Sequence, residues 1–105
     1  MPYFIRARTY LRYAEEEFRR GHFREAFLLA AKALWALSQV EAPKETPSPE
    51  TILAALSGAV EPEVVRFFRE GWTRFEEGLS PEEARELARE ALLKAREILA
   101  PILGP

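Results

Sequence analysis

The chain has 105 residues, with 17 acidic side chains, 15 Lys and Arg side chains and a formal net charge of −2 at neutral pH. It contains no Cys, Asp or Asn and one histidine, His22. This composition excludes cysteine nucleophiles, zinc ribbons, disulfide frameworks and any site that needs Asp or two histidines. Abundant Glu and Arg beside so few thermolabile residues is a pattern typical of thermophile proteins. The length predicts one domain over residues 1–105.

Neither a signal peptide nor a membrane span is expected. Residues 1–12 carry three arginines and no apolar core of the required length. The longest nearly uncharged run, residues 26–40, is interrupted by Lys32 and is too short to cross a bilayer. We therefore expect a soluble, cytoplasmic protein with no membrane contact.

The first half of the chain predicts two helices. Apolar residues recur at three- and four-residue steps between Tyr3 and Arg20, which indicates an amphipathic helix, and Gly21 ends it. A second helix is predicted over residues 22–41. Between residues 26 and 40 its only charge is Lys32, so it is apolar almost all round. A helix of this kind is normally surrounded by others.

A loop and two more helices follow. Three prolines in residues 42–49 predict a connecting loop. Ser48 then caps a short helix that begins at Pro49 and ends at Gly58. Pro62 opens a fourth helix that runs through Glu77.

The fourth helix carries more apolar residues than one buried stripe needs. At about 100° per residue, they cover an arc of roughly 160°. Val65 and Phe67 lie at the edges of this arc, where the core of a single chain is expected to leave them uncovered. An uncovered aromatic patch on a small protein usually marks a subunit interface. We predict a homodimer whose interface includes Val65, Phe67, Phe68 and Trp72.

The last helix is the most regular. Gly78 ends the fourth helix, and Ser80 and Glu83 form a predicted capping box for the fifth. Its apolar residues keep the helical period as far as Leu99, and Pro101 is expected to close it. No segment alternates with period two. The predicted fold is all-α: an antiparallel, up-and-down bundle of four main helices plus one short helix.

The side chains that could carry chemistry are few. His22 lies at the junction of the first two helices, with Glu25 and the run Glu15 to Glu17 as its nearest acids. It lacks companion ligands, so a histidine in a solvated turn is the simpler prediction. The glutamate clusters fit solvated helix faces, because consecutive helical residues point in different directions. We expect no catalytic residue, no metal and no cofactor.

Three arginines have no acid at helical spacing: Arg6, Arg8 and Arg69. Residues 1–24 carry a net charge of +3 and residues 61–100 a net charge of −3. These arginines are candidate contacts for a nucleotide or for RNA phosphates. Domains that bind nucleic acid by charge are usually far more basic than this chain, so solvated arginines or subunit contacts are the competing prediction.

Two stretches carry a family resemblance. Ala14 to Leu34 reads A-x(3)-F-R-R-G-H-F-R-E-A-F-L-L-A-A-K-A-L, and Glu77 to Ala84 reads E-G-L-S-P-E-E-A. With a short proline-preceded helix between them, this order resembles the HEPN domains of prokaryotes. The resemblance implies a small helical bundle, often dimeric and found as the partner of a minimal nucleotidyltransferase. In some branches such domains act as metal-independent ribonucleases.

The ribonuclease branch carries an arginine followed four to six residues later by a histidine. Here His22 follows Arg19 and Arg20 by three and two residues, and no histidine comes later. The resemblance therefore implies a non-nuclease member: a homodimeric partner of a nucleotidyltransferase, or a substrate- or nucleotide-binding module. The alternative is a tetratricopeptide-like interaction adaptor, because residues 21–26 followed by Ala33-Leu34 also resemble one such helical hairpin.

Overall fold

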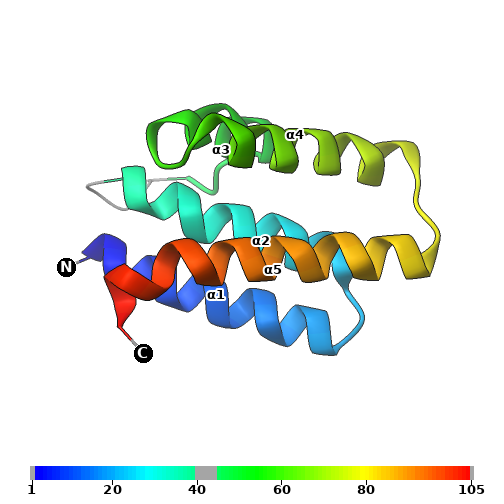
Figure 1. The fold of residues 1–105 in the computed structure, drawn as a ribbon, viewed down its shortest axis with the longest axis horizontal. Helices are drawn as coiled ribbons and strands as arrows, with labels where there is room; N and C mark the ends of the chain where they lie inside the picture. The colour runs from blue at the N-terminus through cyan, green and yellow to red at the C-terminus, as the bar shows by residue number, and fades with distance from the viewer. Residues whose placement is uncertain (1, 40–44, 105) are drawn as a thin grey trace.

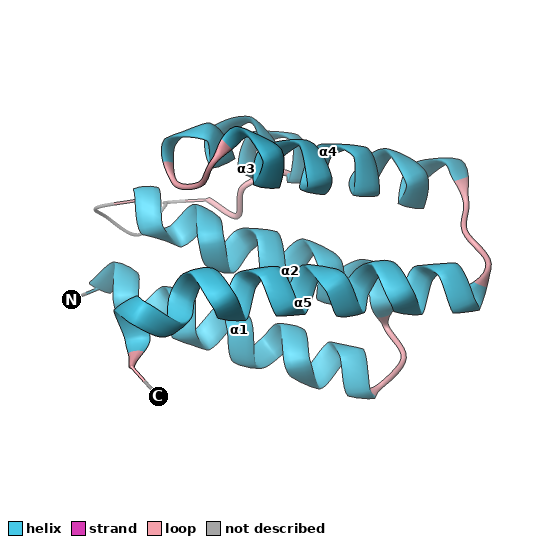
Figure 2. Cartoon of the chain, viewed as in Figure 1, coloured by secondary structure: helices cyan, strands magenta, loops and turns pink. Residues whose placement is uncertain are grey.

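Helices account for all the regular structure of the described chain. The computed structural model describes residues 2–39 and 45–104, and these contain no strand (Figure 2). The all-α prediction is therefore confirmed. The elements, shown in Figure 1, are α1 (Pro2–Arg19), α2 (Phe23–Trp35), the 3-10 turn η1 (Ala36–Ser38), α3 (Pro49–Ala55), the 3-10 turn η2 (Leu56–Gly58), α4 (Pro62–Glu77) and α5 (Pro81–Leu103).

Local sequence signals set most helix ends. At the start of α3, the side chain of Ser48 accepts a hydrogen bond from a backbone N–H of the first turn. Ser80 and Glu83 form the reciprocal bonds of a capping box at the start of α5. Gly21 and Gly78 adopt φ angles of 82° and 104°, which glycine reaches without a Cβ penalty. These predicted boundaries are confirmed.

The predicted end of the second helix is wrong. Helix α2 ends at Trp35, and the chain continues as the turn η1. The hydroxyl of Ser38 donates to the carbonyl of Trp35 at 2.8 Å, a side-chain bond that competes with continued helix. Gln39 is extended, and residues 40 and 41 of the predicted helix lie outside the described residues.

Pro101 does not close the fifth helix as predicted. Helix α5 continues to Leu103, and the N–H of Gly104 donates to the carbonyl of Ala100 at 3.0 Å. Because Pro101 lies in the last turn, its missing N–H removes at most one intrahelical hydrogen bond. The helix therefore keeps its last residues.

Helix α2 lies at the centre of the molecule and contacts α1, α3, α4 and α5. This confirms that the nearly uncharged helix is surrounded by others. The radius of gyration is 12.7 Å, close to the value of about 13 Å expected for a globular chain of this length. Among residues 2–39 and 45–104, none of the helices combines the length and the apolar character that a membrane span requires.

Small side chains join α2 to α1 and α5. The alanines at these contacts have no exposed surface, which allows the helix axes to approach closely. Helices α1 and α5 run in opposite directions, because Arg8 reaches the carbonyl of Leu103 at 2.9 Å while Arg96 reaches the carboxylate of Glu15 at 2.7 Å. The buried alanines are Ala7, Ala14, Ala26, Ala30, Ala31, Ala33, Ala36, Ala88, Ala91 and Ala95.

Aromatic rings fill the space between α2 and α4. The fully buried ring of Phe27 lies with its centroid 5.9, 5.2 and 5.2 Å from those of Phe67, Phe68 and Phe75. Gly71 faces the same ring: a Cβ atom at this position would lie 2.5 Å from the Cζ atom of Phe27. Glycine is therefore the residue that lets the ring reach the surface of α4.

This layer accounts for the wide apolar arc of α4. Val65, Phe68 and Trp72 are buried within the single chain, and Phe67 is half-buried with the Lys94 ammonium 4.9 Å from its ring centroid. The expectation that the core leaves Val65 uncovered is wrong, because Val65 is 8% exposed and belongs to the hydrophobic core. Three of the four predicted interface residues are thus covered by the chain itself, Phe67 keeps part of its surface exposed, and the homodimer stays a prediction.

Candidate functional site

The three predicted arginines do not form one surface. Arg6 and Arg8 share the first turns of α1, and each donates to a main-chain carbonyl: Arg6 to Gln39 at 2.7 Å and Arg8 to Leu103 at 2.9 Å. Arg69 is exposed on α4, and Figure 1 places α2 and α5 between α4 and α1. Arg6 and Arg8 thus connect helix ends, whereas Arg69 lies apart from them.

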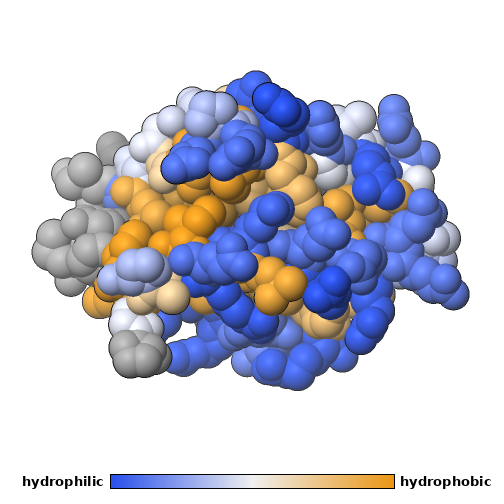
Figure 3. All heavy atoms as spheres, viewed as in Figure 1, coloured by the Kyte–Doolittle hydropathy of each residue, from blue (hydrophilic) through white to orange (hydrophobic). Residues whose placement is uncertain are grey.

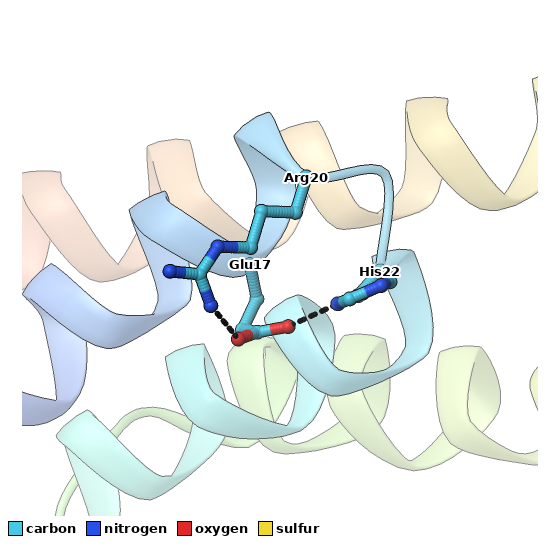
Figure 4. Close-up of polar contacts among 3 residues, drawn as sticks. All are labelled: Glu17, Arg20 and His22. Atoms are coloured by element: carbon cyan, nitrogen blue, oxygen red, sulfur yellow. Dashed lines mark hydrogen bonds and ion pairs between the residues drawn. The ribbon is translucent and has the colours of Figure 1, made fainter.

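His22 is paired with Glu17, one of the acids nearest to it in the sequence. Its Nδ1 atom lies 2.5 Å from Oε2 of Glu17, and Nη1 of Arg20 lies 3.4 Å from the other oxygen of the same carboxylate (Figure 4). Gly21 forms the turn that brings His22 back toward the last turn of α1. Glu17 therefore ties the end of α1 to the start of α2.

An oriented imidazole is one part of an acid–base site, but a reacting site also needs a nucleophile or a group that stabilises developing charge. His22 borders a shallow depression of about 510 Å³ between the α1–α2 and α4–α5 links. The charged groups on its lining are Arg24, whose guanidinium lies 4.6 Å from the Trp72 ring centroid, and Glu25. The other lining residues are Gly21, Phe23, Phe75, Gly78, Leu79, Pro81 and Ala84.

Two shifted pKa values have structural causes. Hydrogen bonding with Ser80 lowers the pKa of the Glu83 carboxyl group, which accepts from the Ser80 backbone N–H in the cap of α5. Burial lowers the pKa of Lys32, whose ammonium lies 4.6 Å from the Tyr10 ring centroid. Glu83 thus stabilises the start of α5, and Lys32 lies at the contact between α1 and α2.

A second hollow lies between the start of α4 and the last turns of α5. It has a volume of about 530 Å³, and its apolar floor is formed by Ala59, Val60, Val64 and Ile98. Figure 3 shows apolar surface gathered on this face of the molecule between those two segments. A neighbouring depression of about 320 Å³ shares Val64 and Ile98, so the two form one continuous surface, which we call the α4–α5 groove.

Acidic side chains surround the α4–α5 groove. Glu61 lines its larger part, and Glu63 and Glu97 line the smaller part together with Lys94. Sequence reasoning missed the groove because Ile98 was grouped with the buried face of the last helix. The available signal was the pair of valines, Val60 and Val64, that flank Glu61, Pro62 and Glu63 at the start of the fourth helix.

Within residues 2–39 and 45–104, no three His, Cys, Asp or Glu side chains lie close enough together to hold a metal ion. Comparison of the chain with protein-family models, with curated proteins and with solved structures finds no match in any of the three.

Proposed function

We propose that this chain is a non-catalytic helical module that works by binding a partner protein. We further propose that its helices form an antiparallel up-and-down bundle of the HEPN kind. Supporting the second point, a short helix with a proline at its first position lies between two pairs of longer helices, as in the order that carries the resemblance. Both stretches that carry the resemblance include a tight link at a positive-φ glycine, Gly21 or Gly78.

The observation that carries the binding function is the α4–α5 groove. Val60, Val64 and Ile98 remain only partly covered, although the chain buries larger side chains completely elsewhere. Open apolar surface with a polar rim is typical of protein contact sites. The partner implied by the family resemblance is a small nucleotidyltransferase, and a homodimer is the assembly in which the chain would bind it.

Co-expression tests this proposal. A small nucleotidyltransferase encoded beside this chain should co-purify with it, and light scattering should give the mass of a complex containing two copies of the chain. A chain that stays monomeric and shows no complex at micromolar concentrations of both proteins would contradict the proposal.

The non-catalytic part needs a separate measurement. We expect no cleavage of single-stranded or structured RNA by the purified chain, alone or with the nucleotidyltransferase. His22→Gln is the informative variant, since it removes the imidazole from an exposed position. RNA cleavage that His22→Gln abolishes while the thermal midpoint stays unchanged would overturn the non-catalytic proposal.

A further inference from the structure

The floor of the α4–α5 groove is apolar. Val64, in the first turn of α4, and Ile98, on α5, line both parts of it, and Val60, in the link before α4, lines the larger part. Ile102 follows Ile98 by four residues on α5, and residues four apart on a helix lie on one face, so these two isoleucines form a short ridge. Ile102 extends the ridge beyond the groove lining and keeps 42% of its surface exposed.

The charge at the rim of this groove is one-sided. Glu61, Glu63 and Glu97 are exposed, and none takes part in an ion pair or side-chain hydrogen bond among the described residues. The one basic side chain on the lining is Lys94, whose ammonium already lies against the Phe67 ring. The surrounding segment, residues 61–100, carries a net charge of −3. An occupant with positive charge beside its apolar contacts is therefore favoured.

We propose that the α4–α5 groove binds a basic amphipathic helix of the partner protein. The occupant carries apolar side chains at positions i, i+3 or i+4, and i+7, with Lys or Arg on both flanks. Its apolar face covers Val64, Ile98 and Ile102, and its flanking charges meet the three glutamates. This inference rests on the proposed partner-binding function and names the surface and the chemistry of the partner.

The shape of the groove favours a helix over a small molecule. Small-molecule sites usually bury most of the ligand and place several polar groups around it. This groove is open to solvent, so it would leave most of a small ligand uncovered. An open apolar surface between the start of α4 and the ridge on α5 is the kind of surface on which an amphipathic helix lies.

A synthetic peptide tests the proposal with the full chain. The probe is a fluorescein-labelled 18-residue peptide with leucines at helical spacing flanked by lysines. One control peptide has the same composition with the leucines distributed around the helix, and another has glutamate in place of lysine. Fluorescence anisotropy should show binding of the first peptide alone, and its affinity should fall as the salt concentration rises.

Two variants locate the binding. Replacing Glu61, Glu63 and Glu97 together by glutamine should weaken the affinity by about tenfold, because three charge pairs are lost. The matched control replaces Glu70, Glu76 and Glu77, which are also exposed on α4, and should stay within about twofold. Ile102→Ser removes an apolar contact from a partly exposed position and should also weaken binding. Circular dichroism should show that each variant remains folded.

Several results would overturn the inference. Equal binding of the scrambled peptide, or equal loss in both glutamine triples, would show non-specific charge attraction. A dimer of this chain that Ile102→Ser dissociates would assign the groove to a second copy. If a nucleotidyltransferase binds the chain and the Glu61, Glu63 and Glu97 triple alike, the proposed function stands and the groove assignment fails.

Discussion

Replacing Gly71 by alanine tests the packing between α2 and α4. The added Cβ atom would lie 2.5 Å from Cζ and 2.8 Å from Cε2 of Phe27, where carbon atoms prefer about 3.5–4.0 Å. The ring must therefore move by about 1 Å. Phe27 is fully buried beside three other rings, so this movement displaces side chains that are already packed.

Two effects of opposite sign determine how much Gly71→Ala changes the free energy of unfolding. Overpacking a buried site costs about 1–3 kcal/mol. Alanine in a helix interior is more favourable than glycine by about 0.5–1 kcal/mol. The overpacking is larger, so Gly71→Ala should lower the free energy of unfolding by about 1–2 kcal/mol. For a chain of this size, that loss lowers the thermal midpoint by about 4–15 °C.

The assay is guanidinium unfolding followed by circular dichroism, performed with a double-mutant cycle. Phe27→Leu removes the outer ring atoms that the new methyl group meets, so Gly71→Ala in that background should be neutral or stabilising. The reasoning is refuted if Gly71→Ala stabilises the wild-type chain, or if it costs the same in both backgrounds.

Three further predictions concern charge and burial. Hydrogen bonding with Ser80 lowers the pKa of the Glu83 carboxyl group, so the ionised carboxylate stabilises the fold above the ordinary pKa of 4.5, and this stabilisation is lost as the pH falls through the folded-state pKa. The thermal midpoints at pH 7 and pH 3 should therefore differ less for Glu83→Gln than for the wild type. Equal differences would contradict the role of Glu83 in the cap. Phe68→Ala should lower the free energy of unfolding, measured by denaturant titration, by about 3–5 kcal/mol, because the Phe68 side chain is fully buried. If the variant is as stable as the wild type but dissociates a dimer in light scattering, Phe68 lies at a subunit interface instead. Arg6→Ala should lower the free energy of unfolding by about 1–2 kcal/mol, because the hydrogen bond from Arg6 to the Gln39 carbonyl is lost. Arg69→Ala should leave the thermal midpoint unchanged. Equal midpoints for the two variants would show that the Arg6 bond does not stabilise the fold.

Local signals were sufficient to predict most of the helices. A capping serine with a proline after it, or a glycine with positive φ, acts within a few residues, so the bounds of α4 and the starts of α3 and α5 follow from sequence. The end of α2 could not be predicted from sequence, because the periodic apolar pattern continues past Trp35 while the Ser38 side chain favours a turn. Periodicity gives the buried face of a helix and leaves its last residues undetermined.

Contacts between distant residues could not be predicted in this way. Arg96 and Glu15 are 81 residues apart, and no spacing rule pairs them. The pairing of Glu17 with His22 spans only five residues, but it depends on the tight turn at Gly21. The α4–α5 groove is harder still, because it exists only once the relative rotation of two helices is known.

The buried alanines affect how the free energy of folding changes with temperature. An alanine side chain has no rotamers to lose, whereas each buried leucine gives up about 0.5–1 kcal/mol of side-chain entropy at 25 °C. Ten alanines with no exposed surface therefore avoid roughly 5–10 kcal/mol of ordering cost that leucines at the same positions would carry. Because an entropic cost grows in proportion to absolute temperature, this saving increases on heating.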